Sequence, residues 1–537
     1  MKSVSLVTLM VMCAICAHAK PEPLKVYILA GQSNMTGMVS TNTFEHIKMF
    51  PDTAKEFAAM FDKKGNPVVL DDVYVSCWPK GDYTLKGKLK PGYGGGSGWT
   101  MIGPEYPFGI YMHKKLQEPI LIIKTAQGGR NLCTNFRSPS AGEWTPSKGH
   151  PDLVAKPAPL PLPKKLDLAA DYVPPKDLVP EEPNRNTGKN MGIVGGVRGV
   201  PIGEMNGVHP IYLVSRVGKE KDIPGQPFQV GDLIIGVDGA GLREKPVAQW
   251  REAWFGSMGQ DGDWMITITR WRKGKIETFD VDIAEVKVGG RKNLQAHLAA
   301  QAKKDSENPK IIKGYYYKMM IDHVKNVLKD VKKYHPGYDE KAGYEIAGFV
   351  WFQGYNDLVN GSTYPNRDKP RGYEQYTWLL EHFIRDVRKD LNTPKLPFVV
   401  GVLGIGGIDD PPTSNTGYFQ QAQAAVADEP EFKETVAAVQ AGKYWDYELA
   451  ALAEKGKLHG KWRGDGWKNA VGADGKPLFK ERPTYEEYRA KFITPKGIEI
   501  LAKGVSNEGF HYLGSAKIMA GIGKGFAEAM IGLQEKD

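Results

Sequence analysis

Residues 24–35, LKVYILAGQSNM, join a short apolar run to a polar turn that contains a serine. The run at 24–30 has the length of a buried β-strand. A serine in a sharp turn after such a strand is held outward, where a base can take its proton and a substrate carbonyl can reach it. The residues do not read G-x-S-x-G, so the ordinary α/β-hydrolase turn does not fit. A serine at a strand end is also a common helix cap.

Three further apolar runs of strand length follow, and helical patterns lie between them. The runs cover residues 119–124, 346–351 and 397–402. Apolar residues recur every three or four positions at 316–331, and residues 373–390 read as another helix. Helices that alternate with fully apolar strands predict a parallel sheet covered on both faces. In such α/β sheets, functional residues lie just beyond the carboxyl ends of the strands.

The composition is that of a folded protein with more than one domain. The chain has 537 residues, of which 41% are hydrophobic and 25% are charged. The formal net charge is +9, but the basic residues are spread along the chain. Because a nucleic-acid-binding protein more often gathers them into one patch, we expect no nucleic-acid partner.

Residues 1–19 have the layout of a cleaved signal peptide. Lys2 supplies the positive charge, an apolar run follows, and Ala17-His18-Ala19 forms the small-x-small end. The run is short for a membrane span, and no later run reaches that length. We therefore expect an exported protein without a transmembrane segment, in the periplasm or outside the cell.

Two cysteines, Cys77 and Cys133, remain after the signal peptide. In an oxidising compartment they can form one disulfide or stay as two buried thiols, and the sequence leaves both alternatives open. The mature chain has no CxxC pair and no Cys/His cluster with the spacing of metal ligands. We expect no metal and no other cofactor.

Two segments interrupt the α/β pattern. The first is a linker at 151–189, where nine of the first 33 residues are prolines, as is typical of a stiff extended chain. The second, at 190–287, reads as short strands with one helix. Within it, residues 230–239, VGDLIIGVDG, resemble the PDZ signature in which a Gly-Asp pair turns the chain into a buried strand. We predict a small β-rich, PDZ-like insertion with a peptide or protein ligand, inside an α/β domain formed by 20–150 and 288–537.

Donor groups follow the second and third strands as well. Gly128 and Gly129 follow the second strand, and glycine lets a backbone N–H approach a ligand closely. Gln353 follows the third strand, and its amide can donate a hydrogen bond. Together with the N–H of Ser33, these groups would make a three-donor oxyanion hole for a tetrahedral acyl intermediate. Each glycine pair can equally be a plain turn.

His511 is the candidate general base. It lies just before the last helix, three residues after Glu508. That spacing across a turn can place a carboxylate on the imidazole Nδ1, so that Nε2 faces the serine. His323 and His382 lie in amphipathic helices and His335 precedes a proline in a loop, so we assign them no role.

Four blocks in this order resemble the SGNH-type hydrolases. They are GQSNM after the first strand, IKTAQGG after the second, WFQGYND after the third, and a late acid-x-x-His. The resemblance is strongest to the sialate O-acetylesterase-like group, carbohydrate esterase family six, and covers residues 23–150 and 310–535. It implies a flavodoxin-like three-layer α/β/α SGNH hydrolase fold, and hydrolysis of acetyl esters on carbohydrates.

The resemblance implies Ser33 as nucleophile and His511 as base, with Glu508 as the third member of a triad. The N–H of Ser33, a glycine at 128 or 129, and Gln353 would form the oxyanion hole. We expect neighbouring polar residues to contact the substrate: Gln32, Asn34, Arg137, Tyr355 and Asp357. Arg137 can meet an acidic sugar or form a surface salt bridge, and the sequence leaves both open.

Two positions depart from the family pattern. Glu508 stands where the family has Asp, so we expect either a triad or a Ser–His dyad helped by backbone carbonyls. The family's third block commonly reads Q-G-E-x-D, and Tyr355 stands at its Glu position, which implies a changed substrate specificity. The sugar is not readable: sialic acid, xylan and pectin are all compatible. Two alternatives stand beside this interpretation, another SGNH ester hydrolase and an inactive hydrolase-fold scaffold that binds peptide C-termini through its insertion.

Overall fold

The structure, a computed structural model, describes residues 22–78, 85–95, 101–142, 160–173, 191–192, 198–205, 208–216, 227–242, 253, 264–288, 292–293, 295–296, 300, 313–409, 411–472 and 474–535. The expected signal peptide and most of the proline-rich segment lie outside these residues. The chain divides into two compact units, a first unit of Met1–Val154 with Ile312–Asp537 and a second unit of Ala155–Ile311.

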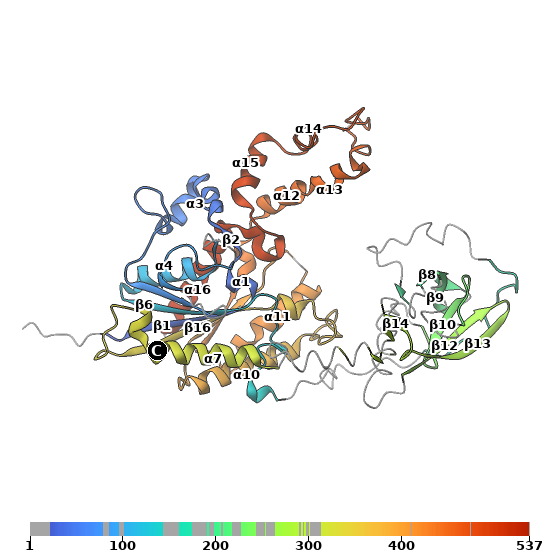
Figure 1. Ribbon diagram of the computed structural model, residues 1–537, viewed down its shortest axis with the longest axis horizontal. Helices are drawn as coiled ribbons and strands as arrows, with labels where there is room; N and C mark the ends of the chain where they lie inside the picture. Colours follow the sequence, from blue (N-terminus) through green and yellow to red (C-terminus); the bar gives the residue numbers. More distant parts are fainter. Residues whose placement is uncertain are drawn as a thin grey trace, which may run out of the picture. The chain divides into compact units, whose positions relative to one another are not determined.

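A seven-stranded sheet forms the centre of the first unit (Figure 1). Its strands, in spatial order, are β18 (Val436–Gln440), β17 (Phe398–Val402), β16 (Tyr344–Phe352), β1 (Leu24–Gly31), β6 (Ile120–Ala126), β3 (Val73–Cys77) and β4 (Lys86–Lys88). All neighbours pair in parallel except β3 and β4. The four apolar runs of the sequence are thus confirmed as parallel strands.

The spatial order of the parallel strands differs from their order along the chain. Numbered along the chain, β3-β6-β1-β16-β17-β18 reads 2-3-1-4-5-6, whereas the same sheet without β3 would read 2-1-3-4-5, as in flavodoxin. Strands β3 and β4 add an antiparallel pair beyond β6, and β3 joins the sheet parallel to β6. This order puts β1 between β6 and β16, so the turns that follow these three strands become neighbours.

Helices cover both faces of the sheet (Figure 1). On one face α4 (Glu105–Leu116) packs against α16 (Ala516–Gln534), and on the other lie α7 (Tyr315–Leu328) and α10 (Glu374–Asp390). The last two confirm the helices expected from the apolar periodicity, because their buried residues recur at the predicted spacing. Further α-helices of the first unit are α1 (Ser33–Thr36), α2 (Phe44–Lys48), α3 (Pro51–Glu56), α8 (Val331–Tyr334), α9 (Tyr355–Leu358), α11 (Asn415–Ala425), α12 (Tyr447–Gly456), α13 (Leu458–Arg463), α14 (Tyr485–Ala490) and α15 (Pro495–Gly504).

The second unit contains an antiparallel sheet of its own. In spatial order its strands are β13 (Lys275–Asp282), β12 (Met265–Arg272), β10 (Leu233–Val237), β9 (Val208–Arg216), β8 (Arg198–Met205) and β7 (Met191–Gly192), and β11 (Ala240–Gly241) pairs with β10. A separate pair in the same unit is β14 (Lys287–Val288) with β15 (Lys292–Asn293), and the first unit has the pair β2 (Val39–Ser40) with β5 (Met101–Ile102). The insertion is β-rich as expected, whereas its PDZ-like nature stays a prediction.

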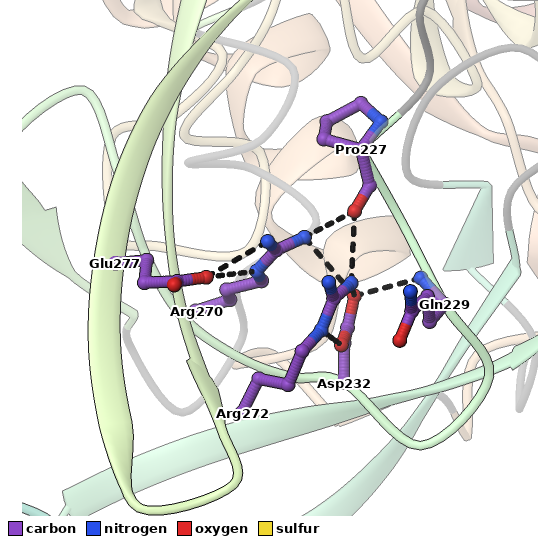
Figure 2. A network of polar contacts seen from close by, with 6 residues as sticks. All are labelled: Pro227, Gln229, Asp232, Arg270, Arg272 and Glu277. Carbon is purple, nitrogen blue, oxygen red and sulfur yellow. Dashed lines mark hydrogen bonds and ion pairs between the residues drawn. The ribbon is translucent and has the colours of Figure 1, made fainter.

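An ion-pair network holds the Gly-Asp turn ahead of β10 (Figure 2). Gly231 has φ 98°, a conformation that glycine adopts without strain. The carboxylate of Asp232 is almost fully buried and accepts hydrogen bonds from Arg272 at 2.5 and 2.6 Å and from Arg270 at 3.4 Å. Arg270 also pairs with Glu277 at 2.8 Å. These contacts hold the turn directly before β10, and all five residues of that strand are buried.

The described part of the proline-rich segment, residues 160–173, packs on the second unit's sheet. Leu166 is buried in a cluster that includes Leu233 and Trp271, and the carbonyl of Leu160 accepts a hydrogen bond from Gly241 at 2.8 Å. Side chains alternate between the two faces of a strand, so Ile234 faces the main apolar cluster of this unit and Leu233 faces the opposite side of the sheet. Leu166 packs on that side and shields Leu233 from solvent. Residues 160–173 therefore contact the second unit's sheet, and the linker over 151–189 stays a prediction.

Cys77 and Cys133 do not form a disulfide with each other. Cys133 is buried, and this burial raises the pKa of its thiol, whereas Cys77 is partly exposed. Of the two alternatives left open by the sequence, the disulfide is therefore absent from this structure. Among the described helices, none has the length and apolar character needed to cross a membrane.

Candidate active site

The polar turns that follow β1, β6 and β16 meet at one edge of the first unit's sheet. The last residues of these strands are register partners, and the strands run parallel. Their carboxyl ends therefore lie together, as expected for a ligand site in an open α/β sheet. This brings Ser33, Gly128 and Gln353, which are far apart in sequence, to one place.

Gly31 allows the turn that carries the serine. Its φ is 155°, and a Cβ at this position would lie 2.2 Å from the carbonyl oxygen of Phe352. The N–H of Gln32 then donates a hydrogen bond to the same carbonyl at 3.3 Å, and α1 begins at Ser33. Any side chain at position 31 would push this turn away from β16.

Gly128 lies directly beside Ser33, whose side chain is 9% exposed. A Cβ placed on Gly128 would lie 3.7 Å from the Cβ of Ser33, whereas one on Gly129 would meet nothing within 4 Å. Within the described residues, neither the N–H of Ser33 nor that of Gly128 donates a hydrogen bond. Two backbone donors beside the serine hydroxyl are therefore available to a ligand.

A buried ion pair supports the far end of α1. Lys124 in β6 and Glu105 at the start of α4 are both buried and lie 2.6 Å apart. Lys124 also donates to the carbonyl of Thr36, the last residue of α1, at 2.8 Å, and Glu105 accepts from the N–H of Gly103 at 2.9 Å. This pair was not predicted from the sequence, although a lysine at the end of the apolar run 119–124 was a signal.

Gln32, Gln353 and Asp357 form a buried network behind the serine turn. The amide nitrogen of Gln353 lies 3.1 Å from Gln32 Oε1, 2.7 Å from Asp357 Oδ2 and 3.1 Å from the carbonyl of Arg130. Its two hydrogens are thus directed at acceptors of the protein, which corrects the expected oxyanion role of Gln353. Gln32 and Asp357 are also buried, and the protein supplies hydrogen-bond partners for both side chains, so they position the turns.

Asp357 joins the loop after β6 to the loop after β16. Its carboxylate accepts from the N–H groups of Leu132 at 2.7 Å and Cys133 at 3.2 Å, and from the hydroxyl of Tyr364 at 2.9 Å. Burial raises the pKa of Asp357, while these hydrogen bonds oppose the shift. Asp357 therefore holds the two loops together, instead of contacting a substrate as we expected.

Arg137 likewise serves its own loop. It is buried, and its guanidinium donates to the carbonyls of Cys133 at 3.1 Å, Ala141 at 2.7 Å and Gly142 at 2.8 Å. Carbonyls in such a loop need donors when no strand or α-helix supplies them. These contacts tie Arg137 to its own loop, and its two expected roles stay predictions.

Two further residues expected to contact the substrate, Asn34 and Tyr355, lie in the short helices α1 and α9 that follow β1 and β16. Asn34 is 2% exposed, and neither polar atom of its amide has a hydrogen-bond partner in the described part of the chain. The ring of Tyr355 stacks on Phe510, with centroids 5.7 Å apart and planes at 26°. Phe510 is 40% exposed and its ring lies 4.5 Å from that of His511. The sequence analysis missed Phe510, although it directly precedes the candidate base.

His511 lies in η11 (Gly509–Gly514), and its ring contacts Asn507 instead of Glu508. Nδ1 of His511 is 2.9 Å from Asn507 Oδ1. The carboxylate of Glu508 is exposed and forms no hydrogen bond with the ring, as far as the described residues go. The expected Glu508–His511 pair is therefore wrong, because Glu508 precedes the first residue of η11 with its side chain in solvent.

The loop that carries His511 is tied to the chain just after α1. Ser506 Oγ accepts from the N–H of Ser40 at 3.1 Å, and Thr43 Oγ1 donates to the carbonyl of Gly514 at 3.3 Å. Element η11 also packs against α1, which carries Ser33. No hydrogen bond joins Ser33 to His511 within the described residues; such bonds often form only with substrate bound. Burial lowers the pKa of His511, and the charge of Glu508 opposes this.

A protein-family model described as "Carbohydrate esterase, sialic acid-specific acetylesterase" matches residues 23–145 and 316–447. The match covers a little under half of the chain and includes Ser33, Gly128 and Gln353, but ends before His511. It indicates a carbohydrate esterase with an acetylated carbohydrate as substrate. No curated protein matches the chain.

Two solved structures are similar to this chain at low identity. One is a protein of Arabidopsis thaliana, with 11% identity, a TM-score of 0.29, and coverage of 88% of this chain and 99% of that one. The other is described as a novel carbohydrate acetylesterase from Xanthomonas citri. It has 11% identity and a TM-score of 0.29, and the match covers 77% of this chain and 49% of that one.

Proposed function

Because two of its segments match the model of the sialic acid-specific acetylesterases, we propose that this protein is an exported serine esterase of the SGNH type. It removes O-acetyl groups from carbohydrates. The observation that carries the proposal is the position of Ser33, at the edge where three parallel strands end, beside Gly128 and the loop of His511. Export is inferred from the signal-peptide layout of residues 1–19.

The mechanism follows from the chemistry of these groups. His511 Nε2 takes the proton of Ser33 Oγ, which attacks the acetyl carbonyl carbon. The N–H groups of Ser33 and Gly128 stabilise the oxyanion of the tetrahedral intermediate. The sugar oxygen then leaves with the proton from His511, and an acetyl-enzyme remains. Water, deprotonated by His511, attacks this ester and releases acetate and free Ser33.

Substrate contacts are assigned to Asn34, Tyr355 and Phe510. The amide of Asn34 offers a donor and an acceptor that have no partner among the described residues. The stacked rings of Tyr355 and Phe510 offer an apolar face beside His511. Sugar rings also have apolar C–H faces, so an aromatic surface at this place is compatible with a carbohydrate substrate.

Acetate release from acetylated xylan, O-acetylated sialic acid and 4-nitrophenyl acetate tests this function. We expect the protein to release acetate from at least one acetylated carbohydrate, and to cleave 4-nitrophenyl acetate faster than 4-nitrophenyl octanoate. A preference for the octanoate would favour the alternative of a broad SGNH ester hydrolase. A protein that cleaves none of these esters would contradict the proposal and favour the scaffold alternative.

The second unit is proposed to be a PDZ-like domain that binds peptide C-termini. The support is the Gly-Asp turn, held by Asp232 and its arginines, that leads into the buried strand β10. Fluorescence anisotropy of labelled peptides with the full chain measures such binding. We expect binding that needs a free C-terminal carboxylate. Equal binding of peptides with amidated C-termini would contradict the PDZ-like assignment.

A further inference from the structure

The side-chain oxygen of Asn507 accepts from two groups of the same loop. It lies 2.8 Å from the backbone nitrogen of Glu508 and 2.9 Å from Nδ1 of His511. A backbone N–H is always a donor, so the Asn507 atom that faces it must be the amide oxygen and not the nitrogen. The contact with Glu508 therefore fixes the orientation of an amide that is otherwise ambiguous.

This orientation determines the tautomer of His511. A carbonyl oxygen only accepts hydrogen bonds, so Nδ1 of the neutral ring must carry the hydrogen. The lone pair of the ring is then on Nε2, which is the form that a general base needs. Burial also lowers the pKa of His511, so the neutral ring dominates at neutral pH.

We propose that Asn507, and not Glu508, is the positioning residue for His511, which makes the site a Ser–His–Asn arrangement. The inference rests on the proposed esterase function of Ser33 and His511. A neutral amide orients the ring when its oxygen faces Nδ1, and the Cys–His–Asn sites of other hydrolases show that an amide can take this position. Unlike a carboxylate, it adds no negative charge at Nδ1.

The backbone of the loop closes around Asn507. The N–H of Asn507 donates to the carbonyl of Leu513 at 3.0 Å. To reach this position the chain passes through three consecutive left-handed residues, Tyr512, Leu513 and Gly514, with φ of 54°, 60° and 59°. A Cβ on Gly514 would lie only 2.8 Å from the Cβ of Asn507. Such a conformation persists only where neighbouring contacts impose it, so these contacts fix the position of Asn507 beside Nδ1 of His511.

Within the part of the chain that the structure describes, Glu508 is the charged group whose field reaches the His511 ring. It raises the pKa of the imidazole from an exposed position. Lys457, at the junction of α12 and α13, interacts with Glu508 in turn. Neither makes a hydrogen bond with the ring within the described residues. The two candidate partners of His511 can therefore be separated by their effects on its pKa.

Three variants of the full chain test the proposal through pH profiles of kcat/KM for 4-nitrophenyl acetate. Asn507→Ala should lower kcat by roughly 100-fold or more, because the ring loses its orientation. Asn507→Asp should stay active, with the acid-side midpoint moved to higher pH, because a carboxylate stabilises the imidazolium. Glu508→Gln is the matched control: it should keep kcat and move the midpoint slightly to lower pH, since it removes a charge that raises the pKa.

Nitrogen NMR of the imidazole adds a readout that does not depend on activity. We expect the His511 signals, assigned by their loss in His511→Gln, to show the Nδ1–H tautomer in the unmodified protein. An Nε2–H tautomer, or a loss of activity in Glu508→Gln as large as that in Asn507→Ala, would overturn the proposal. If the unmodified protein hydrolyses no ester, the esterase function fails, while the tautomer still decides whether Asn507 orients the ring.

Discussion

Replacing Ser33 by alanine is expected to lower kcat for acetyl-ester hydrolysis by roughly 10⁴-fold or more. The hydroxyl of Ser33 is the group that would form the acetyl-enzyme, and the variant leaves His511 without an oxygen to activate. Loss of a single oxygen from a turn that Gly31 and Gln32 hold in place should leave the fold intact. Acetate release at equal concentrations of folded protein, checked by circular dichroism, measures the effect.

Ser140→Ala is the matched control for this variant. Ser140, in η3 (Pro139–Ala141), places its hydroxyl 2.8 Å from Nδ1 of His382, so the chain has a second serine–histidine pair. This pair is exposed and joins η3 to α10. We expect Ser140→Ala to keep the full kcat. Activity that survives Ser33→Ala but is lost in Ser140→Ala would move the nucleophile to the other pair.

Asp357→Ala is expected to lower the free energy of unfolding by about 3 kcal/mol or more, since each buried donor left without an acceptor costs about 1–3 kcal/mol. The variant leaves the N–H groups of Leu132 and Cys133 and the hydroxyl of Tyr364 without their acceptor. The loops after β6 and β16 then lose their connection, so kcat should fall as well. Urea denaturation and acetate release measure the two effects, and an Asp357→Ala protein as stable as the unmodified one would contradict the assignment.

Asp357→Asn is the corresponding control, because it keeps the volume and one acceptor oxygen. It should lose less stability than Asp357→Ala. It should also change the pH dependence: burial raises the pKa of Asp357, so the folded protein binds this proton more tightly than the unfolded chain does. The contribution of Asp357 to stability therefore falls as the pH rises above 3.8, its ordinary pKa. Unfolding measured from pH 4 upward should show this decline in the unmodified protein and not in Asp357→Asn.

Much of the fold could be predicted because it depends on local patterns. The apolar runs at 24–30, 119–124, 346–351 and 397–402 have the length and the absence of alternation that a strand buried on both faces requires, and all four are strands of one sheet. Since parallel strands end at a common edge, the same runs also predicted that the turn of Ser33 and that of Gly128 come together.

The direction of polar side chains could not be predicted in the same way. Gln353 and Arg137 follow strands, as ligand-binding residues do, but both are buried and donate to oxygens of the protein. Whether such a group faces inward or outward depends on which carbonyls and carboxylates need a donor nearby. Those acceptors come from segments far away in the sequence, such as Asp357 for the N–H groups of residues 132 and 133.

The sequence by itself determined the parallel sheet, the serine turn after its first strand and a histidine ahead of the last helix. Only the tertiary structure decided which neighbour of His511 supports its ring. Asn507 and Glu508 are adjacent, and the acid three residues before the histidine is the partner that sequence spacing favours. Which of the two lies under the ring depends on the left-handed turn at Tyr512 and Leu513, and on the anchors that Ser40 and Thr43 provide from the other end of the chain. Contacts of this kind fix the direction of a side chain, and residue spacing alone does not contain them.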